Sequence, residues 1–295
     1  MYYIIYGVLY LLSLLPFWFL YAVGDLMYLV LYYLIGYRKT IVLSNLATAF
    51  PEKTQSERIK IARKFYHYLV DNFVEVLKQL SMKEETFFKR CTGNIEVVNE
   101  IAMRGKNIQL HSGHQFNADY GGWYYSKNSM VPMYGLYVKV SNKAINRLFL
   151  KLRNRFGLAL IEAAEFRNKI HNMYRQQYVF GWIADQNPSN PRKAYWLNFF
   201  NKPAPFVRAP ELSAVKNNVA VVFVRIRKIR RGYYYYENTP ITENAANFTT
   251  GELTRKYRDF LEESIRADPA NYLWSHRRWK HEYQSHDLNY WIDQS

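Results

Sequence analysis

The first 37 residues carry the feature that most limits what this chain can fold into. No charged side chain occurs from Met1 to Gly24, and after Asp25 the stretch from Leu26 to Tyr37 is again uncharged. A helix rises ~1.5 Å per residue, so the first uncharged run is long enough to cross a hydrocarbon layer of ~30 Å. Because no Lys or Arg precedes the run and no small-residue cleavage site follows it, a signal peptide is disfavoured. We expect residues 1–37 to form a hydrophobic membrane anchor.

Two geometries are open for this anchor, because Pro16 and Asp25 interrupt the apolar run. Residues 2–22 can span the bilayer with a kink at Pro16, or two short helices on either side of Pro16 can lie within one leaflet. In the spanning geometry, the positive-inside bias places the basic body of the protein in the cytoplasm. A buried core helix is the remaining interpretation, although a helix of this length with an apolar surface all round is unusual.

Charge and composition narrow the class of partner. The 295 residues include 40 Lys and Arg against 24 Asp and Glu, which gives a net charge of +16. Such a basic chain predicts an anionic partner: nucleic acid, a phospholipid surface, or an acidic protein or substrate. A hydrophobic content of 49% is sufficient for a folded core. The single cysteine, Cys91, excludes an internal disulfide and a cysteine-cluster metal site.

After the anchor, the pattern predicts one α/β domain over residues 38–295. Thr54-x-x-Glu57 is a capping box that opens a helix, in which apolar residues recur at helical spacing: Ala62, Phe65, Leu69, Phe73, Val76 and Leu80. On this helix Asn72 and Glu75 are interpreted as a solvated edge. Strands are predicted at 108–110, 131–138, 179–184, 219–226 and 233–236, and helices at 143–156 and 252–265. This alternation predicts a mixed central sheet covered by helices.

One histidine and one carboxylate form the first candidate site. In His114-x4-Asp119, five helical steps would place the two side chains on different faces of a helix. They meet only if His114 lies on a loop after the predicted strand and Asp119 lies in the turn or helix that follows. Asp119 would then accept a hydrogen bond from one imidazole nitrogen, and the other nitrogen would take a proton from a hydroxyl group. The spacing alone is a weak signal, because chance produces it easily.

Two further segments carry polar groups. Asp185-Gln186 follows a predicted strand, where α/β sheets commonly place ligands, although a turn rich in Asp, Asn and Pro explains it equally well. The segment Tyr272–Lys280 interleaves aromatic and basic residues, a pattern typical of binding to nucleic acid or lipid phosphates. The basic run Arg225–Arg231 is interpreted as a solvated strand end. His276, His281 and His286 recur at a spacing that fits neither a helix nor a strand, so no metal site is predicted.

Several ordered motifs together are similar to one protein family. They extend from about Arg38 to Lys280 and comprise Asn45-Leu46, Phe50-Pro51-Glu52, Asn72 with Glu75, His114-x4-Asp119, Arg153 with Gly157, Asp185-Gln186-x-Pro188, Phe199-Phe200 and Tyr272–Lys280. In this order and spacing, the chain resembles the late acyltransferases of lipid A biosynthesis, within the wider lysophospholipid acyltransferase superfamily. An apolar N-terminal anchor is also typical of that family.

The resemblance implies a membrane-bound enzyme that moves a fatty acyl group from a thioester, usually acyl-carrier protein, to a hydroxyl group of a lipid A precursor. It implies that His114 is the general base, that Asp119 orients the imidazole, and that no covalent intermediate, metal or organic cofactor is needed. The enzyme would act at the cytoplasmic face of the bacterial inner membrane on an anionic lipid, without nucleic acid. The family motifs also imply a set of substrate-binding residues: Arg153, Asp185, Gln186 and Asn117.

Some positions depart from the family pattern and leave alternatives open. The lipid A enzymes commonly carry Glu at the position of Asp119, whereas Asp is usual in their glycerolipid relatives. An acyltransferase for a glycerophospholipid or an amino-acid-derived lipid is therefore the first alternative. The second is a membrane-tethered protein without enzymatic activity, which would bind nucleic acid or anionic lipid through Arg225–Arg231 and Arg277–Lys280.

Overall fold

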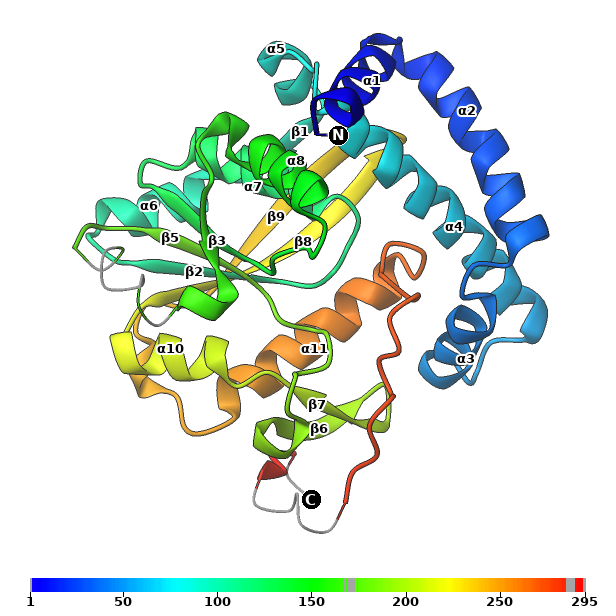
Figure 1. Cartoon of the computed structure of the whole chain (residues 1–295). Helices are drawn as coiled ribbons and strands as arrows, with labels where there is room; N and C mark the ends of the chain where they lie inside the picture. Colours follow the sequence, from blue (N-terminus) through cyan, green and yellow to red (C-terminus); the bar gives the residue numbers. More distant parts are fainter. Residues whose placement is uncertain (1, 167, 169–172, 174, 285–289, 294–295) are drawn as a thin grey trace.

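The computed structural model describes the chain except for residues 1, 167, 169–172, 174, 285–289 and 294–295 (Figure 1). The α-helices are α1 (Tyr2–Leu14), α2 (Phe17–Leu29), α3 (Lys39–Ala49), α4 (Gln55–Lys78), α5 (Glu84–Phe88), α6 (Glu96–Met103), α7 (Ala118–Asn128), α8 (Lys143–Arg153), α10 (Ala209–Asn217) and α11 (Glu252–Ala267). The strands are β1 (Cys91–Gly93), β2 (Ile108–Ser112), β3 (Met133–Tyr137), β4 (Ala159–Glu162), β5 (Val179–Ile183), β6 (Tyr195–Phe199), β7 (Lys202–Phe206), β8 (Ala220–Arg230) and β9 (Tyr233–Thr242).

Seven of these strands form a mixed central sheet in the order β1-β9-β8-β2-β5-β3-β4, and β6 pairs with β7 in a separate hairpin. The ladder from β8 through β2, β5 and β3 to β4 is parallel, whereas β9 runs antiparallel to β8. The predicted α/β class with a mixed, helix-covered sheet is therefore confirmed. Adjacent parallel strands end at the same edge of a sheet, and this edge positions the candidate site.

Alternating side chains of β8 fill two separate cores on the two faces of the sheet. Val221 and Phe223 face one core together with residues of α11 and of the β6–β7 hairpin. Val222 and Val224 face the other core, which contains residues of α6 and α7. In Figure 1, α10 and α11 accordingly lie below the sheet, and α6, α7 and α8 lie above it. This alternation is the period-2 pattern of a strand that is buried on both faces.

The N-terminal helices pack along α4, at the right of the sheet in Figure 1. The first helix ends before Pro16, and α2 continues into a π-helix over Val30–Ile35. One stripe of this second helix is buried at i, i+4 spacing: Leu20, Gly24, Tyr28 and Tyr32. A Cβ atom at Gly24 would lie 3.3 Å from Val74 of α4, so glycine lets the two helices approach closely. α4 itself begins at the predicted capping box of Thr54 and Glu57.

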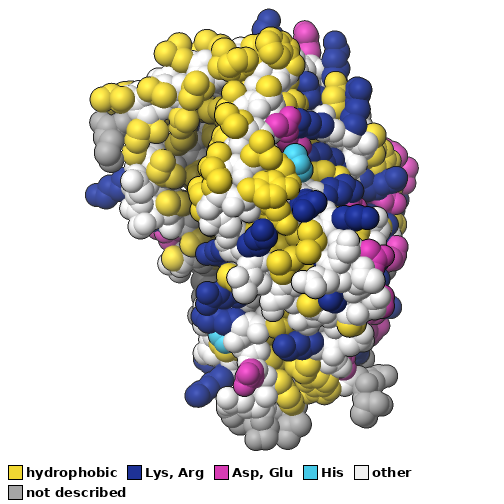
Figure 2. All heavy atoms as spheres, turned by 90° about the vertical axis from the view of Figure 1, so that its right-hand side faces the viewer, with side chains coloured by type: hydrophobic (Ala, Val, Ile, Leu, Met, Phe, Trp, Pro, Cys, Tyr) yellow, Lys and Arg dark blue, Asp and Glu magenta, His cyan; other side chains and the backbone are white. Residues whose placement is uncertain are grey.

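Opposite this buried stripe, the same helices present an apolar surface. Phe17–Ile35 is long and apolar enough to cross a membrane by length and composition. Figure 2 looks onto this side and shows hydrophobic side chains over the upper part of the molecule, with Lys and Arg side chains beside them. The large hydrophobic residues exposed on the two helices include Ile4, Leu11, Trp18, Leu26, Leu34 and Ile35. Phe73 of α4, one of the apolar residues that recur at helical spacing, is also 57% exposed, so this series does not lie wholly on the buried face.

The basic run at the end of β8 is an anchoring point, and its interpretation as a solvated strand end was wrong for two residues. The Lys228 side chain is 3% exposed, and its ammonium lies 2.8 Å from Asp71 of α4. Arg231 pairs with Asp71 at 2.7 Å and with Asp25 of α2 at 2.6 Å. These cations are drawn inward because two carboxylates from different helices face the end of the strand. They fasten α2 and α4 to the sheet.

Candidate active site

The candidate site lies at the carboxyl ends of β2 and β5, which are neighbouring parallel strands with Ser112 opposite Ile183. The chain leaves β2 through Gly113, and a Cβ atom there would lie only 2.5 Å from Leu261 of α11. Glycine therefore allows the loop to pass close to this helix. His114 follows, and α7 begins four residues later at Ala118. The loop-then-helix arrangement predicted for His114 and Asp119 is present.

The carboxylate that holds His114 belongs to Asp185, immediately beyond β5. Asp185 Oδ1 lies 2.5 Å from His114 Nδ1, and both Asp185 oxygens accept from the His114 backbone N–H at 3.1 Å. The Asp185 side chain is 1% exposed, whereas that of His114 is 30% exposed. Burial lowers the pKa of His114, but the charge and hydrogen bond of Asp185 outweigh it and raise this pKa above its usual value. Burial raises the pKa of Asp185, and His114 brings it below its usual value.

Asp119 has a different partner from the one predicted. It lies in the first turn of α7, and its Oδ1 accepts from Nε of Arg153 at 2.8 Å. The expected hydrogen bond from the imidazole to Asp119 is therefore replaced by the one to Asp185. The physical reason is the strand order, which brings Asp185 directly beside the histidine loop, while Asp119 turns toward the end of α8. Asp119 remains close enough for its charge to help raise the pKa of His114.

These side chains open into a cavity of about 560 Å³ between the sheet and α7. Its polar end is lined by His114, Asp119, Arg153, Gln186 and Asn187. Most of the remaining wall is apolar, and its larger residues include Leu110, Tyr125, Met133, Leu158, Leu160, Trp182, Ile226 and Tyr236. The volume falls within the ~300–1,000 Å³ typical of ligand pockets. An elongated apolar group can occupy the cavity with its reactive end beside His114.

Two of the predicted substrate-binding residues do not line this cavity. Asp185 lies beneath His114, which occupies both of its oxygens. Asn117 is fully buried, and its side-chain amide donates to Glu75 of α4 at 2.5 Å. Both side chains are turned toward protein groups with which they form hydrogen bonds, so neither is placed to contact a substrate. Arg153 and Gln186 do lie on the cavity wall.

The interpretation of Glu75 as part of a solvated edge was wrong, because this residue supports the start of α7 next to the site. It is fully buried and accepts hydrogen bonds from three elements: Asn117 at 2.5 Å, Tyr234 of β9 at 2.7 Å and Tyr21 of α2 at 2.9 Å. Burial raises the pKa of Glu75 to about 7. Asn117 has φ of 135°, a strained conformation for a residue with a side chain. The contact with Glu75 holds this strained residue at the start of α7.

The C-terminal aromatic and basic segment packs against the His114 loop, which contradicts its interpretation as an aromatic stacking surface for nucleic acid. Tyr272, Trp274 and Arg278 are each 3% exposed or less. The Leu273 N–H donates to the His114 carbonyl at 3.1 Å, and Arg278 donates to Asn187 at 3.1 Å. These aromatic faces are covered by protein and are therefore not available for stacking on bases.

Among the described residues, no group of three or more His, Cys, Asp or Glu side chains could hold a metal ion. Of the three evenly spaced histidines, His286 lies outside the described residues. His276 accepts a hydrogen bond from the Asn187 N–H at 3.2 Å. Burial, with the nearby charge of Arg278, lowers the pKa of His276 to about 4, so its imidazole is neutral near pH 7.

Comparison with known families agrees with this geometry. Residues 1–281 match the model of the bacterial lipid A biosynthesis acyltransferases. The chain belongs to this family. It is therefore an O-acyltransferase of the lipid A type, as the ordered motifs predicted. No curated protein matches the chain. The apolar N-terminal helix of this acyltransferase, taken with its family, suggests association with a membrane.

Proposed function

We propose that the acyltransferase moves a fatty acyl group from acyl-carrier protein, or another acyl thioester, to a hydroxyl group of a lipid A precursor. One observation carries the proposal: His114, fixed by a buried carboxylate, lies at the polar end of a cavity with a largely apolar wall. A thioester-linked chain would lie in the apolar part with its carbonyl carbon beside the imidazole. The net charge of +16 suits both an acidic carrier protein and a phosphorylated lipid.

In the proposed reaction, the imidazole of His114 removes the proton from the acceptor hydroxyl as the oxygen attacks the thioester carbonyl. Asp185 accepts from Nδ1, which leaves Nε2 to take the proton and stabilises the imidazolium that forms. When the tetrahedral intermediate collapses, the carbon–sulfur bond breaks and the thiolate receives the proton from His114. No acyl-enzyme forms, because the acceptor oxygen attacks the donor directly.

The developing oxyanion requires a hydrogen-bond donor beside His114, and we assign this role to Arg153. Its guanidinium lines the same cavity and is held at Nε by Asp119, which leaves the two terminal nitrogens to face the substrate. Asp119 is thus proposed to act through Arg153 rather than through the imidazole. In this proposal the pair stabilises the negative charge that develops on the oxygen of the reacting carbonyl group.

We further propose that residues 1–37 seat the enzyme in one leaflet of the cytoplasmic membrane, with the catalytic domain on the cytoplasmic face. The Asp25–Arg231 ion pair lies in the middle of Phe17–Ile35. A spanning orientation would place this pair, and α4 beside it, at the depth of the hydrocarbon, where charged groups are costly. An orientation parallel to the membrane instead buries the exposed apolar side chains and keeps the ion pair with the body of the protein.

The decisive experiment is acyl transfer by the purified full chain with acyl-carrier protein thioester and a lipid A precursor, followed by mass spectrometry of the lipid. His114→Ala is expected to abolish transfer while membrane association remains. His281→Ala is the matched control, because His281 lies outside the cavity wall. Near-normal transfer by His114→Ala would refute the mechanism. Transfer to a glycerophospholipid or an amino-acid-derived lipid, but not to the lipid A precursor, would refute the proposed acceptor.

A further inference from the structure

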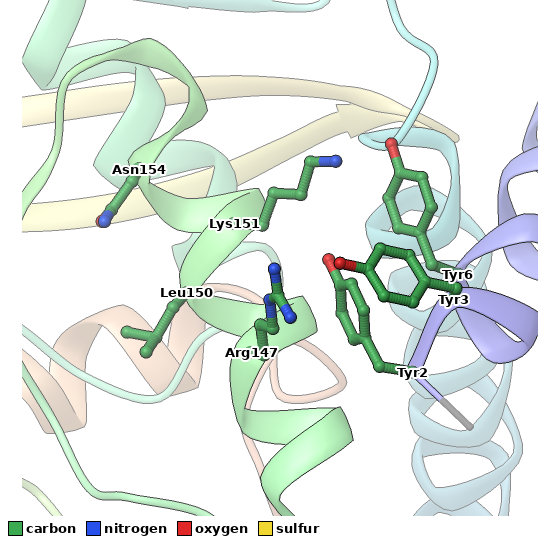
Figure 3. A pocket seen from close by; sticks show the side chains of 7 residues that line it. All are labelled: Tyr2, Tyr3, Tyr6, Arg147, Leu150, Lys151 and Asn154. Atoms are coloured by element: carbon green, nitrogen blue, oxygen red, sulfur yellow. The ribbon is translucent and has the colours of Figure 1, made fainter.

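A second hollow, separate from the active-site cavity, lies between the hydrophobic helix α1 and the basic helix α8. It has a volume of about 420 Å³ and shares no lining residue with the active-site cavity. Figure 3 shows Arg147 and Lys151 reaching from α8 toward three tyrosines of α1. An apolar cluster that includes Leu148 and Leu152 of α8 holds the two helices together, and Tyr2 and Tyr6 of α1 pack against it.

The tyrosine rings hold these two cations at one place. The Arg147 guanidinium lies 4.3 Å from the ring centroid of Tyr2 and 5.5 Å from that of Tyr3, and the Lys151 ammonium lies 3.9 Å from that of Tyr6. Tyr2 and Tyr6 are stacked with centroids 6.0 Å apart. Cation–π contacts of this kind fix the direction of a positive charge but do not neutralise it.

The positive charge of the hollow has no acidic partner in the part of the chain that the structure describes. Arg147 and Lys151 form none of the ion pairs found there, and both are exposed. Lys143 lies one turn before Arg147, so three cations occupy one row of α8 at i, i+4 spacing. Like charges in such a row repel one another, and Lys143 also lies in the first turn, where the helix dipole disfavours a cation. An external anion would relieve both effects.

The surroundings of the hollow favour a lipid as the source of that anion. On the outer side of α1, Ile4 is 72% exposed and Leu11 is 66% exposed. In the proposed seating these side chains enter the acyl region, and tyrosine hydroxyls commonly lie at the level of the headgroups. The row of cations on α8 then faces the same level from the protein side. A phospholipid fits this arrangement, because its phosphate group would lie at the level of the cations and its two acyl chains at the level of the apolar side chains.

We propose that the hollow between α1 and α8 binds the headgroup phosphate of an anionic bilayer phospholipid, distinct from the acyl acceptor. The proposal extends the proposed membrane seating, and it assigns a structural consequence to the bound lipid. α8 ends at Arg153, which pairs with Asp119 at the polar end of the active-site cavity. A lipid bound at Arg147 and Lys151 therefore fixes the helix that carries a proposed catalytic residue.

The test measures binding of the purified full chain to vesicles of phosphatidylcholine alone and to vesicles with about one-fifth phosphatidylglycerol. Binding to neutral vesicles reports the apolar helices, and the added affinity for anionic vesicles reports the hollow. The double variant Arg147→Gln with Lys151→Gln is expected to lose about 30-fold of that added affinity and to keep its binding to neutral vesicles. This readout requires no acyl transfer. The lipid site can therefore be refuted while the proposed enzymatic function stands, and the enzymatic function can be refuted while the lipid site stands.

A matched control removes the same charge elsewhere. Arg192→Gln with Lys193→Gln changes two exposed cations far along the chain and is expected to cost less than about threefold. Equal losses in the two double variants would overturn the proposal, because the net charge alone would then explain the binding. Unchanged anionic binding by the α8 variant would overturn it as well.

Two further measurements distinguish the proposed site from a folding defect of the variant and from binding of anions in general. The charge-conserving pair Arg147→Lys with Lys151→Arg is expected to retain the preference for anionic vesicles, and its loss would contradict an electrostatic site. Sodium phosphate is expected to release the protein from anionic vesicles more effectively than sodium chloride at equal ionic strength. Equal release by both salts would show that the hollow does not select phosphate.

Discussion

Replacing Asp185 by Asn tests which carboxylate serves the imidazole. The substitution keeps the size of the side chain but removes its charge. In the wild type, Asp185 accepts from the His114 backbone N–H and bonds Nδ1 of its ring. An amide offers only one acceptor oxygen for these two donors, and its NH₂ group cannot accept a hydrogen bond from either of them. A hydrogen bond to a charged group is worth ~1.5–3 kcal/mol, so we expect the rate to fall by about 10- to 150-fold.

The pH profile of the Asn variant supplies an independent reading. A general base must be neutral, so the wild-type rate is expected to rise with pH as His114 loses its proton. Asp185 raises the pKa of His114 against the lowering effect of burial. Without the carboxylate the effect of burial remains, so the pKa falls and the acidic limb of the profile moves to lower pH. A purely structural defect would lower the rate without moving this limb.

The assay is the pH dependence of kcat and of kcat/KM for the purified enzyme in detergent, with acyl-carrier protein thioester as donor. Asp119→Asn is the comparison, because Asp119 contributes less than Asp185 to the pKa of His114. Its acidic limb should stay near that of the wild type. If Asp185→Asn keeps the wild-type rate and profile while Asp119→Asn loses both, Asp119 orients the imidazole and our assignment is wrong.

Three further changes test the other parts of the site. The pKa of Glu75 is raised from 4.5 to about 7, so the folded state binds the proton more tightly than the unfolded state, and the contribution of Glu75 to wild-type stability falls by roughly 3 kcal/mol as pH rises from about 4.5 to 7. Glu75→Gln should therefore reduce the dependence of stability on pH in thermal unfolding measured across this range, and an unchanged dependence would exclude Glu75 as its source. Arg153→Ala should lower kcat by about 10²-fold or more with little change in KM, and Arg153→Lys should restore part of the loss; a change confined to KM would instead indicate a role in substrate binding. Trp18→Asp with Leu34→Asp, at positions 72% and 80% exposed, should leave the melting temperature unchanged but weaken flotation with neutral vesicles, whereas undiminished flotation would argue against the proposed membrane face.

Local patterns located β2, β3, β5, β8 and β9 of the central sheet, but not β1 or β4. The apolar runs at 179–184 and 219–226 correspond to strands β5 and β8, and the predicted helix ending before Gly157 corresponds to α8 and the short 3-10 turn after it. These elements are determined by the spacing of apolar residues and by caps within a few residues of each other. The same local reasoning expected His114 on a loop and Asp119 in the turn or helix that follows, and the structure places Asp119 in the first turn of α7.

The partner of His114 was beyond such reasoning. Asp185 lies 71 residues away along the chain and reaches His114 only because β5 pairs with β2. Strand order is decided by packing of the whole sheet, and the period of a single strand contains no information about its neighbour. Glu75 illustrates the same limit, because a charged residue on a helix is usually solvated. Its burial depends on the tyrosine donors of two distant elements.

The hydrogen bond from Tyr21 to Glu75 has a practical consequence for anyone who wants a water-soluble form of this enzyme. Deleting the apolar N-terminal helices is the obvious route, yet the deletion would remove Tyr21, one of the hydrogen-bond donors to the buried carboxylate of Glu75. The same deletion would remove the ion pair between Asp25 and Arg231 and leave Arg231 paired with Asp71 alone. A shortened enzyme would thus be weakened in its interior as well as released from lipid. Polar substitutions on the outward side of α1 and α2 would spare these bonds.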